Sequence, residues 1–233
     1  MPLLLVLLLA FGSSALAQSN VENRSAFTSE PGVQGEVNAI VIQPDGKVII
    51  GGHFTSVNGQ PRGNLARLNP DGTLDSTFAN TFEAGVSGQV LALALQADGS
   101  VIVGGSFNQA NSFQIYNIAR YKADGSIDKG FASGDGTGSP GTDGPVFALT
   151  VQPDGKIILG GSFSQVIGQP RRSVARLNAD GSLDAPVLSN PQAASGTVKS
   201  VVLDARGALV AGGRFSVQNQ TAQNLLKASP SGN

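Results

Sequence analysis

The chain has 233 residues, a formal net charge of -1 and only 13% charged residues. This balance excludes a chain kept disordered by charge repulsion and a basic surface that attracts nucleic acid. Cysteine is absent, which excludes disulfides, thiolate metal sites, cysteine nucleophiles and lipid attachment through cysteine. The single histidine, His53, cannot form a multi-histidine metal site and is expected to be a surface or strand residue.

The first 17 residues differ in composition from the rest of the chain. Residues 3–11 are almost entirely aliphatic, and an Ala-Leu-Ala motif ending at Ala17 follows them. We therefore predict a signal peptide over residues 1–17, although this segment carries no Lys or Arg. A membrane anchor is the alternative, but it needs about 20 apolar residues and this run is shorter. The mature protein is expected to be secreted, periplasmic or at the cell surface, without insertion into a membrane.

The sequence that follows, residues 18–233, contains one motif four times. The motif has two short apolar segments around a tight turn, mostly Asp-Gly, and then two adjacent glycines. The second of these glycines lies at position 52, 105, 161 or 213, so the spacings are 53, 56 and 52 residues. The first three copies continue into a second Asp-Gly turn inside a Leu-Ala-Arg-like motif, and the fourth stops at its turn. A fixed period of this length is typical of repeat architectures.

The turns and their apolar flanks predict β-hairpins in which a type I turn ends in a glycine of left-handed conformation. These glycines are Gly46, Gly72, Gly99, Gly125, Gly155, Gly181 and Gly207. In the second hairpin, the register that places Leu68 opposite Leu74 also places Arg67 opposite Asp75. The same register pairs Arg120 with Asp128 and Arg176 with Asp184. An opposite-charge pair across a ladder adds roughly 0.2–1 kcal/mol and fixes the register, so a structural role is favoured over a repeated binding or catalytic site.

Each repeat thus has two hairpins, and no segment shows helical periodicity. The first hairpin is apolar at consecutive positions, so other sheets must cover both of its faces. The paired glycines reduce side-chain volume where strands converge, and the phenylalanine after them is expected to fill space between repeats. These phenylalanines are Phe54, Phe107, Phe163 and Phe215. We predict an all-β fold, a β-propeller of about four four-stranded blades, with a right-handed β-solenoid as the alternative.

The two motifs also carry a family resemblance. The strings Gln-Pro-Asp-Gly-Lys-Val/Ile-x-x-Gly-Gly-x-Phe and Leu-Ala-Arg-Leu-Asn-x-Asp-Gly-Ser/Thr-Leu-Asp resemble the delta-60 repeat, a bacterial β-propeller family of unassigned function. The resemblance covers nearly all of residues 19–233. The fourth copy departs from it, with Arg206 in place of the turn Asp and Lys227 in place of the recurring Arg. The resemblance implies an exported or surface protein and no known catalytic residues.

Closure of the ring is the open structural question. The blades are expected at approximately residues 37–78, 90–131, 146–187 and 198–233, with the last completed by residues 19–36. This exchange would close the ring and cover its edge strands. Four blades are at the low end of the usual range, so a fragment of a longer chain, an open arc and a ring shared by two chains as a homodimer remain alternatives.

The leading hypothesis for function is a non-catalytic binding or scaffold module for an unknown protein or glycan, without nucleic acid or a cofactor. The inter-blade loops at residues 81–88, 133–144 and 189–199 would form its recognition face. The alternatives are a passive repeat segment of a larger surface protein and a propeller hydrolase or lyase, for which the sequence shows no convergent acids, base or metal. Asp135 and Asp143 could bind calcium with low affinity, but a flexible insertion is favoured because the alternating acidic ladder of a calcium loop is missing.

Overall fold

The computed structural model of the chain describes residues 32–78, 85–133, 140–185, 194–217 and 224–229. The predicted signal peptide, Asp135 and parts of all three inter-blade loops lie outside these ranges. Strands, turns and loops make up everything in them, which confirms the all-β prediction. A helix able to cross a membrane is therefore absent from the described ranges.

The strands form four main antiparallel sheets, one for each sequence repeat. The first sheet contains β1 (Val33–Ile42), β2 (Val48–Val57), β3 (Gln60–Pro61) and β4 (Leu65–Leu68), and the second contains β5 (Val86–Leu95), β6 (Val101–Ala110), β7 (Phe113–Gln114) and β8 (Ile118–Tyr121). The third contains β9 (Val146–Val151), β10 (Ile157–Gly161) and β13 (Val174–Leu177), beside the short pair β11 (Gln165–Val166) and β12 (Gln169–Pro170). The fourth contains β14 (Ala194–Leu203), β15 (Leu209–Val217) and β16 (Leu225–Ala228).

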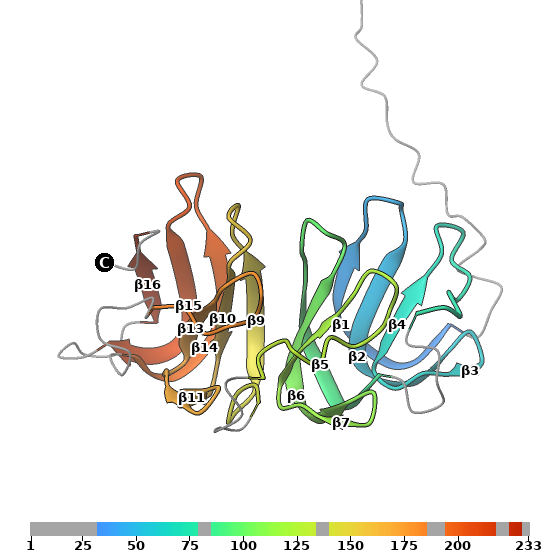
Figure 1. The fold of residues 1–233 in the computed structure, drawn as a ribbon, viewed down its shortest axis with the longest axis horizontal. Helices are drawn as coiled ribbons and strands as arrows, with labels where there is room; N and C mark the ends of the chain where they lie inside the picture. Colours follow the sequence, from blue (N-terminus) through green and yellow to red (C-terminus); the bar gives the residue numbers. More distant parts are fainter. Residues whose placement is uncertain (1–31, 79–84, 134–139, 186–193, 218–223, 230–233) are drawn as a thin grey trace, which may run out of the picture.

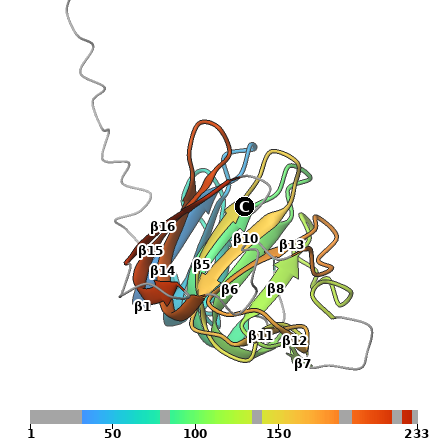
Figure 2. The same ribbon diagram turned by 90° about the vertical axis from the view of Figure 1, so that its left-hand side faces the viewer.

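The four sheets follow one another in chain order, from the blue first sheet to the red fourth sheet at opposite ends of a curved row (Figures 1 and 2). In every sheet the first strand pairs with the second, and the second pairs with the third long strand. The first strands of neighbouring sheets contact one another, β1 with β5, β5 with β9 and β9 with β14. We call β1, β5, β9 and β14 the inner strands, because the sheets converge along them as blades do.

In the first three blades the fourth strand is shorter than predicted. In the first three sheets it consists of a single bridge, Leu68 to Leu74 and its equivalents Tyr121 to Ile127 and Leu177 to Leu183. The backbone N–H of Asp75 still bonds to the carbonyl of Arg67, as the register requires. The Asp75 side chain then accepts a 2.9 Å bond from the N–H of Thr77. This local turn ends the pairing, because it directs the chain away from the ladder toward the next sheet.

The start of β1 differs from the predicted ring closure. Val33 pairs with Val57 and Glu36 with His53, so residues 33–36 extend the first sheet and do not complete the fourth. The two strands approach closely in this pairing, since a Cβ added to Gly35 would lie 2.2 Å from the carbonyl oxygen of His53. Residues 19–31, the rest of the predicted closing segment, lie outside the described ranges.

The hydrophobic core lies between neighbouring sheets. Between the first two, Ile49 and Leu65 pack with Val90 and Phe107. Glycine makes this approach possible, since a Cβ added to Gly51 would lie 2.3 Å from a methyl carbon of Val90. The same contact recurs at Gly104 with Val146 and at Gly160 with Val198, both at 2.8 Å. Each fully buried valine contributes about 1.5–3 kcal/mol, so this repeated contact stabilises every junction in the row.

Candidate functional site

The recurring arginines and aspartates contact one another. Arg67 Nε donates a 2.9 Å bond to Asp75 Oδ2, with both side chains buried. The equivalent ion pairs are 2.7 Å for Arg120 with Asp128 and 2.6 Å for Arg176 with Asp184. In the fourth sheet Lys227 stands in place of the arginine and pairs with Asp204 at 2.7 Å.

The arginines also connect one sheet to the next. Arg67 Nη1 donates a 2.7 Å bond to the carbonyl oxygen of Ala123, in the second turn of the following sheet. Its guanidinium carbon lies 4.6 Å from the centre of the Phe78 ring. Arg120 repeats this arrangement with the carbonyl oxygen of Ala179, at 2.6 Å. Because these donors are used between sheets, the arginines hold the fold and are not free to bind a ligand.

The aspartates of these pairs are held in the charged form. Burial alone would raise the pKa of Asp75, but hydrogen bonds from Lys47 and Thr77 and the charge of Arg67 hold it well below its ordinary value of 3.8. The pKa of Asp128 and that of Asp184 are lowered in the same way, against burial, by their arginines and nearby donors. A carboxylate with a lowered pKa is a poor general acid at neutral pH, which agrees with a structural role.

A second connection between sheets was missed in the sequence. Asn64, with φ of 64°, accepts a 2.8 Å bond from the N–H of Phe54 and donates a 2.9 Å bond to the carbonyl of Val86 in the next sheet. Asn117 donates likewise to the carbonyl of Thr142, at 2.8 Å. The signal was available, because a polar residue directly precedes each Leu-Ala-Arg-like motif.

Of the two candidate calcium ligands, Asp135 lies outside the described residues and only Asp143 can be placed. Asp143 accepts bonds from the N–H groups of Ser164 at 2.8 Å and Gln165 at 2.9 Å, and from the Ser164 hydroxyl. Burial raises the pKa of Asp143, but these donors outweigh burial and lower it. Its carboxylate therefore anchors a loop. Across the described ranges, no three His, Asp or Glu side chains lie close enough to hold a metal ion.

The inner strands carry residues that differ from sheet to sheet at one shared position. A β-bulge interrupts the register of each inner strand beside the paired glycines. The bulged residues are Asn38, Leu91, Phe147 and Lys199. Lys199 Nζ lies 3.4 Å from the centre of the Phe147 ring, so neighbouring bulges contact one another. Bulges redirect side chains and are frequent beside functional sites.

Two pockets, lined by both polar and apolar groups, include residues of the inner strands β1 and β14. The pocket in the first sheet has a volume of about 610 Å³ and is lined by Glu36, His53 and Arg62, among others. The one in the third sheet, about 320 Å³, is lined by Asp143, Ser162 and other polar residues. His53 and Ser162 each follow the second glycine of their repeat, so the two pockets occupy equivalent places.

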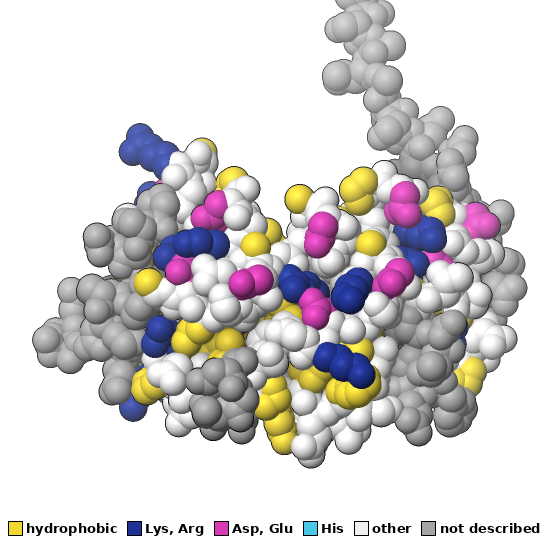
Figure 3. All heavy atoms as spheres, viewed as in Figure 1, with side chains coloured by type: hydrophobic (Ala, Val, Ile, Leu, Met, Phe, Trp, Pro, Cys, Tyr) yellow, Lys and Arg dark blue, Asp and Glu magenta, His cyan; other side chains and the backbone are white. Residues whose placement is uncertain are grey.

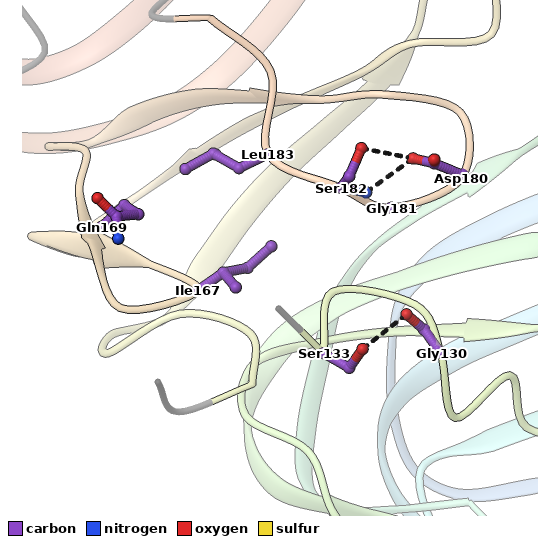
Figure 4. A pocket seen from close by; sticks show the side chains of 8 residues that line it. All are labelled: Gly130, Ser133, Ile167, Gln169, Asp180, Gly181, Ser182 and Leu183. Atoms are coloured by element: carbon purple, nitrogen blue, oxygen red, sulfur yellow. Dashed lines mark hydrogen bonds between the residues drawn. The ribbon is translucent and has the colours of Figure 1, made fainter. Parts of the chain in front are cut away.

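Another pocket, of about 450 Å³, lies between the second and third sheets (Figure 4). Two of its hydroxyl groups already bond to its own lining, Ser182 to Asp180 at 2.7 Å and Ser133 to the carbonyl of Gly130 at 2.9 Å. A further polar side chain of the lining, Gln169, lies on the same side of the pocket as the apolar side chains of Ile167 and Leu183. This pocket has no equivalent among the pockets described above, so we favour the repeated pockets of the inner strands.

The described part of the face drawn in Figure 3 carries charges of both signs. On the face drawn in Figure 3, the Lys and Arg side chains alternate with those of Asp and Glu. Interspersed charges of this kind do not attract a partner by long-range electrostatics. Recognition would therefore depend on the shape and hydrogen bonding of individual pockets.

Comparison with known proteins agrees with this architecture. Residues 43–78, 96–131 and 152–185 match a family model described as a domain of unknown function (DUF5122) β-propeller. No curated protein sequence matches the chain. Each matched segment begins at or just before the turn of a first hairpin and continues through a second hairpin.

Solved structures resemble the fold at low sequence identity. A catalytically inactive virginiamycin B lyase from Staphylococcus aureus, with quinupristin, is 18% identical over 84% of this chain and 53% of its own, with a TM-score of 0.48. A gluconolactonase from Xanthomonas campestris is 18% identical over 79% and 58%, with a TM-score of 0.46. A surface component of the type-IX secretion system of Porphyromonas gingivalis is 15% identical over 84% and 26%, also at 0.46. The chain spans about half the length of the lyase structures that it matches.

The matched repeats and the four converging antiparallel sheets point to the same architecture. The chain is therefore a β-propeller repeat protein.

Proposed function

We propose that this protein is an exported, non-catalytic binding module that takes a polar ligand, a glycan or a segment of another protein, in the pockets along its inner strands. One observation carries the proposal. The side chains that hold the blades together are repeated from sheet to sheet, whereas the bulged residues and part of the pocket linings, such as His53 and its equivalent Ser162, differ between sheets and include exposed polar groups. Residues that are not needed to hold the repeats together can differ between repeats, and such residues are where a repeat protein can bind a ligand.

The chemistry of the pockets suits a ligand rich in hydrogen-bonding groups. The first-sheet pocket offers a carboxylate from Glu36, an imidazole from His53 and a guanidinium from Arg62. The third-sheet pocket adds hydroxyl groups from Ser162 and Ser164. Both volumes fall in the range of about 300–1,000 Å³ that is usual for ligand pockets. Few aromatic side chains line them, so recognition by stacking on a sugar ring is not part of the proposal.

Export is proposed from the N-terminal segment, whose apolar run and Ala-Leu-Ala motif are those of a signal peptide. Extracellular or surface proteins of Bacteroides thetaiotaomicron and Porphyromonas gingivalis are among the structures of similar fold. We also propose that the repeats are delta-60 repeats, on the two motifs described above. A passive repeat segment of a larger surface protein is the alternative that needs no ligand.

One observation favours a second candidate, a hydrolase or lyase. Glu36 and His53 are cross-strand partners that line the same pocket, and a carboxylate beside an imidazole is a common acid–base pair. The other pocket of this kind has no such pair, since Ser162 stands where His53 does. Catalysis would therefore belong to the first blade alone.

The test is a glycan array together with a pull-down, both using the mature protein. The combined variant Glu36→Gln and His53→Ala should lower binding at least about tenfold, since loss of a charged hydrogen bond costs roughly 1.5–3 kcal/mol. Lys122→Ala, an exposed residue that lines neither of the two proposed pockets, is the matched control and should bind normally. No binding in either assay would contradict the proposal and leave the passive repeat segment as the explanation.

A further inference from the structure

Exposed apolar side chains concentrate at the two ends of the row of sheets. Six large hydrophobic side chains are exposed among the described residues, and only Phe113 lies elsewhere. At the first sheet, Val37, Ile40 and Ile42 are 38%, 61% and 68% exposed; we call this surface the head face. At the fourth sheet, Val202 and Leu225 are 53% and 67% exposed; with Gly212 they form the tail face. Apolar surface of this kind usually marks an interface.

The head face repeats a surface that is buried at every internal junction. Val37 pairs with the second glycine of its own sheet, Gly52, as Val90, Val146 and Val198 pair with theirs. Those three valines are completely buried, because each one enters the space above the first glycine of the preceding sheet. Val37 occupies the equivalent position in the first sheet, but the described structure has no preceding sheet for its side chain to pack against.

The tail face repeats the other half of the same junction. A Cβ added to Gly51, Gly104 or Gly160 would lie within 2.8 Å of a valine of the next sheet. At Gly212 the nearest atom in the described ranges is the carbonyl oxygen of Asn224, at 3.9 Å. The glycine recess is therefore present in the fourth sheet, and none of the described residues fills it.

Two further contacts repeat the pattern. Leu65 and Leu225 pair with the first glycine of their sheets, yet Leu65 is fully buried under the next sheet and Leu225 is exposed. Asn64 donates to the carbonyl of Val86 in the next sheet, whereas Asn224, its equivalent, is exposed. By the repeat, the acceptor for Asn224 is the carbonyl of Val33 at the start of the head face.

We infer that the head face of one copy of this chain docks on the tail face of a second copy. A second copy is the occupant because both halves of the contact are in this one sequence, at opposite ends of the row (Figure 1). Two such contacts related by a two-fold axis join two curved rows into one ring of eight blades, within the range of four to eight that is typical of propellers. The inference stands independently of the ligand proposed above.

One departure from the repeat sets the expected strength of this contact. Inside the chain, Arg67 and Arg120 each bond to a carbonyl of the next sheet. In the fourth sheet Lys227 takes that position, is 64% exposed and pairs with Asp204 of its own sheet. The contact between copies thus lacks one hydrogen bond that the first two internal junctions have, so the dimer should dissociate on dilution.

Cysteine crosslinking tests the geometry directly, because the chain has no cysteine of its own. Gly51 and Val90 form the internal equivalent of the proposed contact. A Cβ on Gly51 would lie 3.0 Å from the Cβ of Val90, slightly less than the 3.5–4.5 Å between the Cβ atoms of a disulfide. Mature Val37→Cys and Gly212→Cys chains, carrying different tags, should form a disulfide-linked heterodimer when mixed and oxidised. Val37→Cys alone should give no homodimer, and neither should Gly212→Cys. The Gly51→Cys and Val90→Cys variant, which should crosslink within one chain, is the control for geometry.

Placing both cysteines, at positions 37 and 212, on one chain separates the possible occupants. A linked dimer supports a ring shared by two copies. A linked monomer would show that the chain closes on itself, and it would overturn the inference. The inference would also be overturned if the chain with cysteines at positions 37 and 212 gave no crosslink while the control disulfide between positions 51 and 90 formed.

Sedimentation of variants without cysteine gives an independent readout. Ile40→Asp on the head face and Val202→Asp on the tail face should each raise the dissociation constant of the dimer at least about 100-fold, since each buries an unpaired charge. Mixing the two variants should restore a dimer, through the one intact head and the one intact tail. A wild-type protein that is monomeric at the highest concentration measured would overturn the inference, as would variants that dimerise like the wild type.

Discussion

Arg67 performs two structural tasks with one planar group. Its Nε bonds to Asp75 across the hairpin, and its Nη1 reaches the carbonyl of Ala123 in the next sheet. The guanidinium has donors in a fixed fork and a flat face, so it can also stack on the Phe78 ring. A lysine cannot supply all three contacts, which is consistent with the different partner of Lys227 in the fourth sheet.

Arg67→Ala should destabilise the protein by about 3 kcal/mol, because it breaks a buried ion pair and the bond to the next sheet, and leaves Asp75 with only Lys47 and Thr77 as partners. For a chain of this size this corresponds to roughly 6–12 °C in Tm. Thermal unfolding followed by circular dichroism measures the effect. Lys227→Ala, at the exposed equivalent position, should leave Tm unchanged, and equal losses for the two variants would contradict the two structural tasks assigned to Arg67.

At this scale the sequence predicts only part of the contacts. Arg67 and Asp75 could be paired because the turn glycine and the apolar neighbours allow a single sensible register. The bond from Arg67 to Ala123 could not, since the pattern within one repeat does not say which carbonyl of the next repeat lies in reach. The role of Asn64 was missed for the same reason, although its recurrence in Asn117 was visible.

Among the structural elements, the two glycines of each pair have different roles. The first, such as Gly104, makes room for a valine of the next sheet. The second, such as Gly105, faces its own inner strand, where the bulge brings a backbone carbonyl close. A Cβ on Gly105 would lie 2.0 Å from the carbonyl oxygen of Gln89, and backbone cannot rotate away as a side chain can.

Gly105→Ala should therefore destabilise the protein by about 2–3 kcal/mol through overpacking against backbone. Urea unfolding should show a lower midpoint with an unchanged slope, since the surface exposed on unfolding stays the same. Gly130→Ala is the matched control, because the nearest atom to its Cβ would be Asp128 Oδ1 at 3.5 Å. The steric account fails if the two variants unfold at the same urea concentration.

The hairpins could be predicted from turn chemistry, and the bulges could not. All seven turn glycines have positive φ, between 76° at Gly207 and 96° at Gly181. A bulge depends instead on how the inner strand bends toward its neighbours, and its residues share no chemistry, as Leu91 and Lys199 illustrate. The pockets could therefore not be predicted from the sequence, which indicates a surface or strand position for His53 but not its pairing with Glu36.

For the whole molecule, the blade order follows from the repeat, but closure does not. Every internal junction uses the same valine and glycine, so the sequence predicts that neighbouring repeats stack. It does not predict the angle between sheets, because that angle depends on twist and packing summed over many contacts. The open head and tail faces became apparent only when the exposure of Val37 and Leu225 was compared with that of their buried equivalents.

Acid should destabilise the whole row of blades together, because each of the first three carries a buried or half-buried carboxylate whose pKa is lowered. The pKa values of Asp75, Asp128 and Asp184 in the folded protein lie below the ordinary value of 3.8. Between the folded and unfolded pKa values, the unfolded chain binds more protons than the folded chain, so stability rises with pH. The contribution of these carboxylates is fully present above about pH 5 and is lost as the pH falls below about 4.

Tm should accordingly stay level from pH 7 to pH 5 and fall steeply below about pH 4. Calorimetry across this range measures the effect, and Asp75→Asn tests its origin. That variant should be less stable at pH 7, where it lacks the ion pair with Arg67, and should lose less Tm than the wild type between pH 5 and pH 3. If Asp75→Asn loses as much Tm as the wild type between pH 5 and pH 3, the acid sensitivity arises outside the ion pairs that connect the blades.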